Sequence, residues 1–388
     1  MTTLSFETTR RVYCEPGAST KLGGLLAELG VTRAILVTDP GVMKLGLPKA
    51  ALESLEAAGI AVAIYDRTEA DPPEKLVHEA VEAARQHRAD GVVGFGGGSS
   101  MDIAKLVAFL PVASQQLSEI YGVGFCKGRR LPLVQVPTTA GTGSEVTGIA
   151  IITTGESEKK GVVSPMLLPD IALLDADLTL GLPRHVTAAT GVDAMVHAIE
   201  AYTSKHKKNP ISDALAREAL SLLSRNIRRV CSEEGARDRQ ARSEMLLGAM
   251  LAGMAFANAP VAAVHALAYP VGGHFHVPHG LSNALMLPHV LRFNLENETA
   301  ARQYGELAPV LLPGSSFGST NAAAGALLAE LEAIIDDVKL EKQLRQVGIS
   351  HNHLPMLAKD AMNQQRLLVN NPREVTYDDA LKIYEQAL

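Results

Sequence analysis

The hydrophobic periodicity of this chain changes once, and that change constrains the fold more than any other feature. Up to about residue 183, short apolar runs typical of buried strands alternate with helical patterns; they lie at 33–39, 60–66, 91–95 and 131–136, with helices near 46–58 and 74–88. Strands separated by helices of this length predict right-handed βαβ units in a parallel sheet. Beyond residue 183, apolar residues recur at i, i+3 and i+4, which predicts helices only.

Two domains are therefore expected, an α/β domain over 1–183 and an all-helical domain over 184–388. A length of 388 residues agrees, because single hydrophobic cores stop growing at smaller sizes. Further strands are predicted at 149–153 and 171–175, and the Ala-rich helices of the second half at 213–229, 240–257 and 321–336. A cleft between two such domains is a common place for a ligand site.

Composition and charge exclude several classes of function. The net charge is −6, only 4% of residues are aromatic and there is no Trp, so a nucleic-acid partner is not expected. Cys14, Cys126 and Cys231 are far apart, which argues against a disulfide framework or a thiolate zinc site and fits a cytoplasmic protein. The first 17 residues lack a signal-peptide core, and no run of about 18 apolar residues predicts a membrane span.

A glycine-rich segment, Gly94 to Asp102, lies between a predicted strand and a predicted helix. Glycines let the backbone approach an anion, and the N-terminus of the following helix offers free N–H groups, so a dinucleotide pyrophosphate fits here. The spacing differs from GxGxxG, and a tight turn without a ligand is the alternative. The residues from Ser99 to Asp102 also match a capping box at the start of the helix.

Two further loops offer groups to a nucleotide. Asp39 ends the first clear strand and could accept hydrogen bonds from a ribose, which would favour NAD over NADP; the alternative is an ordinary Asx turn before Pro40. Residues 137–147 are dense in hydroxyls and glycines after a buried strand, and such a loop could line a cofactor with small donors.

Asp193 and His197 are four residues apart in a strongly helical stretch, so both side chains project from one helix face. A carboxylate and an imidazole on adjacent turns can bind one divalent cation. The alternative is a capping box beginning at Thr190, with His197 a packed core residue.

A second histidine cluster favours the metal interpretation. His265 is expected on a helix that ends near Pro270, and His279 on a loop beyond a glycine turn. One aspartate and three histidines make a plausible set of four ligands. His274 and His276 alternate around Phe275 in an expected extended segment and compete for ligation; we expect them outside the ligand set.

Several motifs taken together resemble the iron-containing (group III) alcohol dehydrogenases over essentially the whole chain. These are Gly-Gly-Gly-Ser-x-x-Asp-x-x-Lys at 96–105, Pro-Thr-Thr-x-Gly-Thr-Gly-Ser-Glu at 137–145, Gly-x-Asp-x-x-x-His at 191–197 and the histidine pair at 265 and 279. The resemblance implies a Rossmann-like N-terminal domain and a helical C-terminal domain in a dehydroquinate synthase-like fold, with the active site between them. Homodimers or larger assemblies are common in the family.

The resemblance also assigns residues. It implies Asp193, His197, His265 and His279 as ligands, usually of Fe²⁺ and in some members of Zn²⁺. It implies NAD as the cofactor, NADP being disfavoured by the acidic residue at position 39. The cofactor-binding candidates are Asp39, Gly97, Gly98, Ser99, Asp102, Thr138, Thr139, Thr142 and Lys160.

One departure from the family pattern affects the proton. Many members carry a second histidine four residues after the third ligand, often proposed to relay the substrate proton, and here that position is Tyr269. A tyrosine, with an ordinary pKa near 10, is a poorer base at neutral pH. The relay is left open among Tyr269, His274, water and a ribose hydroxyl. Ile149 would border the substrate and suggests an apolar alcohol.

The expected activity is hydride transfer between an alcohol, a small primary alcohol in particular, and NAD(H). The alternatives within the family's chemistry are a hydroxyacid–oxoacid transhydrogenase, another carbonyl reductase, or a lyase like the dehydroquinate synthases. From a different class, the chain could be a nucleotide-binding protein without catalysis. The expected partner is a small alcohol or aldehyde, without nucleic acid or membrane.

Overall fold

The computed structural model describes residues 4–155 and 158–388, and the chain divides into two compact units. One unit comprises residues 7–181, and the other comprises residues 182–388 together with residues 4–6. The change of unit between Gly181 and Leu182 lies two residues before the boundary expected from the periodicity.

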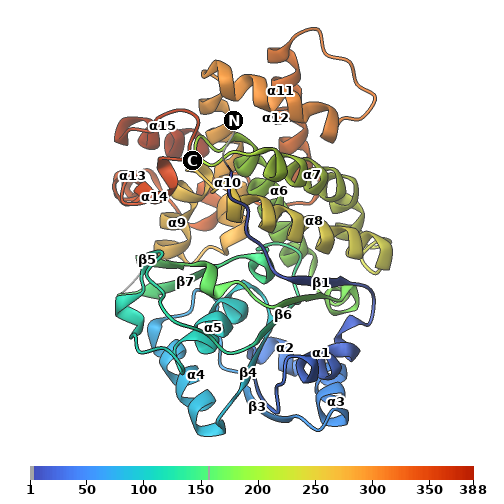
Figure 1. The fold of residues 1–388 in the computed structure, drawn as a ribbon. Coiled ribbons are helices and arrows are strands. Elements are labelled where there is room, and N and C mark those ends of the chain that lie inside the picture. The colour runs from blue at the N-terminus through green and yellow to red at the C-terminus, as the bar shows by residue number, and fades with distance from the viewer. Residues whose placement is uncertain (1–3, 156–157) are drawn as a thin grey trace. The chain divides into compact units, whose positions relative to one another are not determined.

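The N-terminal unit contains a six-stranded sheet in which every strand pair is parallel. In spatial order its strands are β1 (Arg11–Cys14), β9 (Ile171–Leu174), β6 (Leu133–Pro137), β4 (Gly91–Gly96), β2 (Arg33–Val37) and β3 (Ala61–Tyr65) (Figure 1). The parallel sheet is confirmed. Strand β1 was not expected from the sequence, because its four residues include Arg11 and Cys14 and are not continuously apolar.

A smaller three-stranded sheet belongs to the same unit. Its order is β5 (Gly122–Val123), β8 (Glu158–Val163), β7 (Ile149–Thr154), with β7 and β8 antiparallel. The sequence predicted β7 but not β8, whose first three residues are Glu158, Lys159 and Lys160. The helices of the unit are α1 (Leu22–Glu28), α2 (Pro40–Lys44), α3 (Lys49–Ala57), α4 (Glu74–His87) and α5 (Gly98–Phe109), with short 3₁₀ helices η1 (Ala18–Lys21), η2 (Leu117–Glu119), η3 (Ser144–Val146), η4 (Pro165–Leu167) and η5 (Ala176–Thr179).

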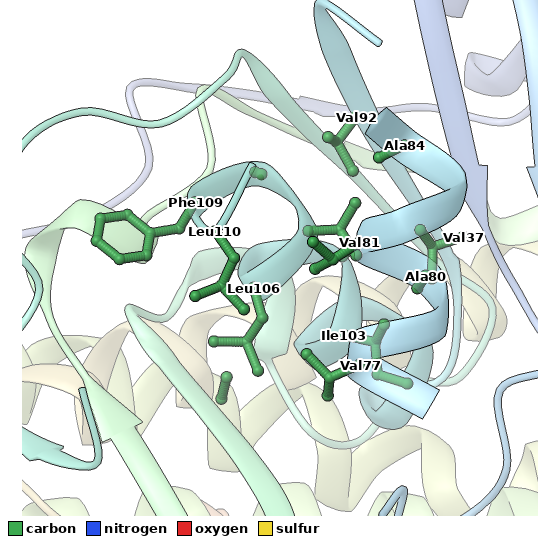
Figure 2. Close-up of a cluster of buried hydrophobic side chains, with 14 of the residues drawn as sticks. Val37, Val77, Ala80, Val81, Ala84, Val92, Ile103, Leu106, Phe109 and Leu110 are labelled. Carbon is green, nitrogen blue, oxygen red and sulfur yellow. The ribbon is translucent and has the colours of Figure 1, made fainter. Parts of the chain in front are cut away.

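The four inner strands of the large sheet, β2, β4, β6 and β9, are buried on both faces, which explains why they are apolar runs without alternation. Along β2, Ile35 and Val37 belong to one hydrophobic cluster, whereas Ala34 and Leu36 belong to another. Successive side chains of a strand point to opposite faces, so the two clusters lie on opposite sides of the sheet. The first cluster includes side chains of α4 and α5 (Figure 2), and the second includes those of α1 and α3.

The second unit consists of helices and loops, without a strand among its described residues. Its helices are α6 (Arg184–Thr203), α7 (Pro210–Cys231), α8 (Arg239–Asn258), α9 (Ala263–Phe275), α10 (His279–Asn294), α11 (Glu298–Leu311), α12 (Thr320–Asp337), α13 (Leu354–Ala361), α14 (Gln365–Leu368) and α15 (Tyr377–Ala387), with 3₁₀ helices η6 (Leu344–Val347) and η7 (His351–His353) (Figure 1). Helix α6 is buried over nearly its whole length and packs against α7, α8 and α10. A helix surrounded in this way holds its side chains in fixed positions, which suits it to carry a ligand set.

Among the described residues, no single helix is long and apolar enough to cross a membrane, although α8 and α9, bent by 107° at their junction, pass that test of length and composition as a pair.

Candidate metal centre and cofactor-binding loops

Helix α6 presents three ionisable side chains on one buried face. Asp193, His197 and Glu200 are at positions i, i+4 and i+7, which coincide around a helix of 3.6 residues per turn. The alternative of a capping box at Thr190 is wrong, because α6 already begins at Arg184. Thr190 instead donates its hydroxyl hydrogen to the carbonyl oxygen of Val186 within the helix.

Helices α9 and α10 bring the other two histidines, and here two local predictions were wrong. The helix carrying His265 does not end near Pro270 but continues to Phe275, and His279 is not in a loop but is the first residue of α10. Proline removes one N–H from the helix, yet packing can override local propensity. The buried faces of α9, with Leu267 and Val271 fully buried, provide that packing.

The four predicted ligands converge. Their ligand atoms all lie within 4.8 Å of one another. The distances from Asp193 Oδ1 to the Nε2 atoms of His197 and His265 are both 3.8 Å, and that to Nε2 of His279 is 3.6 Å. Three of the side chains are almost fully buried, whereas that of His279 is 39% exposed.

Glu200 fixes the orientation of His265. Its Oε2 accepts a hydrogen bond from Nδ1 of His265 at 2.6 Å, and its Oε1 accepts the backbone N–H of Val264 at 2.7 Å. Because a carboxylate only accepts, the ring proton is on Nδ1, and Nε2 keeps its lone pair toward the other ligands. A carboxylate behind a histidine is a common support of metal sites.

A close helix crossing sets the spacing of two ligands. A Cβ atom on Gly280 would lie 2.3 Å from the carbonyl oxygen of Ala189 and 3.3 Å from Cβ of Asp193. No other residue fits there without moving α10 away from α6. Glycine therefore brings the start of α10, and His279 with it, close to Asp193.

The charge on Asp193 is stabilised although the residue is buried. Burial alone would raise the pKa of its carboxyl group, but the imidazoles of His197, His279 and His265 and a hydrogen bond from Asn283 lower the pKa below its usual value. The carboxylate form is the form that binds a cation.

In the N-terminal unit, three predicted cofactor segments follow neighbouring strands of the large sheet. Asp39 follows β2, the glycine segment follows β4, and Thr138 follows β6, with its N–H bonded to the carbonyl oxygen of Gly96 at 2.9 Å. The chain turns from β2 to β3 on one side and then places β4 on the other, so the strand order reverses between β2 and β4. Doubly wound sheets bind ligands at such a switch point, beyond the carboxyl ends of the strands.

The glycine and threonine segments lie against each other. Gly97 is the N-cap of α5, and Gly98 is its first residue. A Cβ on Gly98 would lie 2.8 Å from Cγ2 of Thr142, and one on Gly97 would be 3.9 Å from the side chain of Thr139. Gly96 has φ +152°, a conformation that side chains disfavour. Glycine is therefore structurally required at positions 96 and 98, and the bare backbone at the start of α5 leaves N–H groups available to an anion.

The predicted capping box from Ser99 to Asp102 was wrong, because α5 begins at Gly98 and has no side-chain cap. Asp102 instead accepts hydrogen bonds from the Ser144 hydroxyl (2.6 Å) and from the N–H of Ile151 (2.9 Å). Its role is to connect α5 to the threonine loop and to β7.

Asp39 has a structural role of its own. It is the N-cap of α2, and its Oδ1 accepts the N–H of Val42 at 3.0 Å, as the Asx-turn interpretation expected. Its contact with a ribose stays a prediction. Of the remaining candidates, Thr138 is buried, Lys160 lies on β8 with its Nζ 3.4 Å from Glu158, and Ile149 begins β7.

Comparison with known proteins gives the family. The model of the iron-containing alcohol dehydrogenases matches residues 9–176, and that of the C-terminal part of the Fe-containing alcohol dehydrogenase family matches residues 187–388. The chain belongs to the iron-containing alcohol dehydrogenase family. It is an oxidoreductase of that family, and the fold class expected from the sequence is confirmed.

Individual members of the family align over nearly the whole chain. The long-chain-alcohol dehydrogenase 1 of Geobacillus thermodenitrificans is 40% identical over 374 residues, which cover 96% of this chain and 93% of that protein. The NAD-dependent methanol dehydrogenase of Bacillus methanolicus is 33% identical over 373 residues, covering 96% of each. A crystal structure of a 1,3-propanediol oxidoreductase is 34% identical and has a TM-score of 0.95, with 100% of both chains covered.

The donor set of this family member fits a divalent cation. One carboxylate oxygen and three imidazole nitrogens are ligands that both Fe²⁺ and Zn²⁺ accept. These four acceptor atoms lie within 4.8 Å of one another. Acceptors that converge in this way are stabilised only by a bound positive charge or by hydrogen-bond donors.

The two side-chain candidates for the proton relay, Tyr269 and His274, lie in different surroundings. The ring of Tyr269 lies 6.5 Å from that of His265 and 5.9 Å from that of His279, measured between ring centroids. His274 follows His265 by nine residues, about half a turn around α9. Its Nε2 is 2.5 Å from Asp360 on α13, so His274 is held by another partner. The expected extended segment is wrong: His274 is helical, and His276 is the C-cap of α9.

Sequence reasoning missed three residues of these sites: Glu200, Asn283 and Lys105. Glu200 could have been found, because it continues the i, i+4, i+7 face of Asp193 and His197. Asn283 was missed because His279 was expected in a loop, although the two are four residues apart on α10. Lys105 was quoted within a motif without a role; it is fully buried, and burial lowers the pKa of its ammonium group.

Proposed function

We propose that this protein is a metal- and NAD(H)-dependent alcohol dehydrogenase that interconverts a small primary alcohol and its aldehyde. The observation that carries the proposal is the set of four ligand atoms within 4.8 Å of one another in a member of the iron-containing alcohol dehydrogenase family. A fossil site would have no reason to keep three of these side chains buried at the cost of their solvation.

Asp193, His197, His265 and His279 would hold the cation, Fe²⁺ or alternatively Zn²⁺. When bound, the cation supplies positive charge that lowers the pKa of an alcohol hydroxyl. The chain contributes the fixed position of the ligands. Glu200 keeps Nε2 of His265 available, and the buried environment of Asp193 excludes water from one side. The partly exposed His279 marks the side from which small molecules would enter.

For the cofactor, the N-terminal unit supports a dinucleotide. The backbone of Gly97 and Gly98 at the start of α5 would receive the pyrophosphate, with Thr139 and Thr142 beside it. Asp39 at the end of β2 would bind the ribose and repel a 2′-phosphate, which favours NAD. One relative is itself named as NAD-dependent.

The substrate is proposed as a small primary alcohol. Methanol and 1,3-propanediol, named in two of the similar proteins, are primary alcohols. Ile149 is the candidate apolar contact, and its backbone is held by a 2.6 Å hydrogen bond from Lys105 to its carbonyl oxygen. Of the two relay candidates, Tyr269 is supported by its place next to His265 and His279.

The test is turnover together with bound metal. NADH formation from a panel of alcohols should stop after chelation and return with Fe²⁺ or Zn²⁺. Replacing NAD with NADP should reduce turnover. Full NADH formation by protein whose metal has been removed would overturn the proposal, as would full metal occupancy without any NAD-linked turnover.

A further inference from the structure

Asn283 lies within the ligand set. It is fully buried on α10, four residues after His279 and therefore on the same helix face. Its amide nitrogen, Nδ2, is 2.6 Å from Oδ1 of Asp193, 3.2 Å from Nε2 of His265 and 3.3 Å from Nε2 of His279. One atom of Asn283 therefore contacts three of the four candidate ligand atoms.

The donors and acceptors at this point do not match. An amide nitrogen carries two hydrogens, whereas three acceptors surround it. At the other end of the same amide, Oδ1 is buried and has no hydrogen-bond partner. The NH₂ group of the amide thus donates to acceptors that a cation would otherwise bind. The buried amide oxygen is left without a hydrogen-bond partner, which costs free energy.

The position of the amide nitrogen is also a ligand position. Ligands that share one cation through bonds of about 2.0–2.2 Å are roughly 3.0–3.5 Å apart. The separations of 3.2 and 3.3 Å from the two imidazole nitrogens fall in this range, whereas the 2.6 Å from Oδ1 of Asp193 is the length of a hydrogen bond and would have to increase. An oxygen placed where Nδ2 is now would therefore be at the spacing of a further ligand from the two histidines, and Asp193 would have to move slightly away from it.

We propose that Asn283 serves the metal centre in two orientations. In the cation-free protein its NH₂ group holds Asp193, His265 and His279 together. When the cation binds, the lone pairs of these ligands are taken, and the amide hydrogens would face a positive charge. The amide then turns by half a rotation, so that its carbonyl oxygen faces the cation.

The two orientations of an amide fill nearly the same volume, so the turn needs only the small shift that lengthens the contact with Asp193. The inference rests on the metal-binding part of the proposed function and not on hydride transfer. It concerns affinity and geometry, which are measured without substrate or cofactor.

The decisive comparison is between Asn283→Asp and Asn283→Ala. If an oxygen faces the cation, Asp supplies a charged oxygen in the same place, so N283D should bind Zn²⁺ at least as tightly as the unaltered protein. N283A should bind about ten- to a hundredfold more weakly. If Asn283 only donates to Asp193, the order reverses, because Asp would repel Asp193 and weaken the site more than Ala does.

Zn²⁺ affinity would be measured by chelator competition, and the visible spectrum of the Co²⁺-loaded protein would report coordination geometry. We expect the Co²⁺ spectra of N283D and the unaltered protein to be alike and that of N283A to differ. Asn294→Asp, the same change on α10 in a buried network with Tyr304 and Asn371, is the matched control and should leave Zn²⁺ affinity unchanged.

The outcomes are separable. N283A with unaltered affinity and spectrum, or N283D binding more weakly than N283A, overturns the role of Asn283 while the metal centre stands. If the unaltered protein binds no cation that depends on His265, the proposed function itself fails.

Discussion

Two buried polar clusters of this protein differ in how well their donors and acceptors match. Around Lys105, the ammonium group donates to Ser144 Oγ, Thr147 Oγ1 and the carbonyl oxygen of Ile149 at 2.6–3.0 Å, and its Nζ is also 3.4 Å from Oδ1 of Asp102. Ser144 and the N–H of Ile151 in turn donate to Asp102. Each of these groups has its partner within the protein.

Around Asp193, acceptors face acceptors. Three imidazole nitrogens and a carboxylate oxygen converge, and the amide of Asn283 offers two hydrogens to three of them. The difference teaches how to distinguish architecture from a binding site. A buried network with matched donors is part of the scaffold, whereas a surplus of converging acceptors needs a cation to complete it.

The largest effect on the acceptor-rich cluster around Asp193 is expected from a substitution of His265. His265→Ala removes one of the four acceptors, and we expect loss of bound metal and at least ~1,000-fold lower turnover, more than the ten- to hundredfold typical of supporting residues. Metal content after desalting and NADH formation measure the two effects. The exposed His206, changed to Ala, is the control. Full metal occupancy in His265→Ala would exclude this residue as a dominant ligand.

The Lys105 network should respond in the opposite way. Lys105→Met keeps the volume but leaves Asp102 and two hydroxyl groups without their cation, and we expect the free energy of unfolding to fall by about 3 kcal/mol. Metal content should stay unchanged. Chemical denaturation measures the first quantity, with the exposed Lys75→Met as control. A lower metal content with unaltered stability would contradict the distinction between the two clusters.

Glu200→Gln tests the hydrogen bond by which Glu200 orients His265. The amide no longer holds the ring proton of His265 as a carboxylate does, so metal affinity should fall ten- to a hundredfold with the fold intact. Chelator competition measures it, beside the exposed Glu218→Gln on α7. Unaltered affinity would show that packing alone orients His265.

The buried carboxyl group of Glu145 in the N-terminal unit can be tested by the pH dependence of stability. Burial raises the pKa of its carboxyl group to about 7, a shift opposed by its own backbone N–H and by Lys105. A carboxyl group whose pKa is raised on folding contributes stability below its unfolded pKa and loses that contribution as pH rises through about 7.

Glu145→Gln, which cannot ionise, should therefore gain stability relative to the unaltered protein between pH 5 and pH 8, by about 2 kcal/mol. Thermal unfolding of both proteins without cofactor measures this, with the exposed Glu53→Gln as control. A constant difference across this pH range would contradict the raised pKa.

The smallest effect is expected at Asp39, which is the N-cap of α2 and is also proposed to bind the cofactor ribose. Asp39→Asn keeps the N-cap of α2, because Asn caps about as well as Asp, so stability should change by only a few tenths of a kcal/mol. Loss of the charge should raise the preference for NADP relative to NAD by roughly tenfold, or about 1.4 kcal/mol. Ratios of kcat/KM with the two cofactors measure it; an unchanged ratio leaves Asp39 as a cap alone.

The parts of the molecule that could be predicted are those with a local pattern. The runs of β2 and β4 and the i, i+4 pair of Asp193 and His197 follow from periodicity. The failures have tertiary causes. Strand β8, with its charged start, is defined by pairing with β7, and α9 passes through Pro270 because its faces are buried.

The partners of the ligands were harder to predict than the ligands themselves. That Glu200 on α6 contacts His265 on α9 depends on the tertiary structure, which no spacing in the chain records. The capping box at Ser99 failed for a similar reason: Asp102 finds better donors in Ser144 and Ile151, far along the chain.

The glycine at the crossing of α6 and α10 has a consequence for cation choice. Gly280 approaches the backbone of Ala189 so closely that even one methyl group would separate the two helices. The diameter of the ligand cage is thus governed by a residue without a functional group. If the proposed metal centre is right, we expect substitution at this helix crossing to change the selectivity among ions of different radius, with all four candidate ligands left in place.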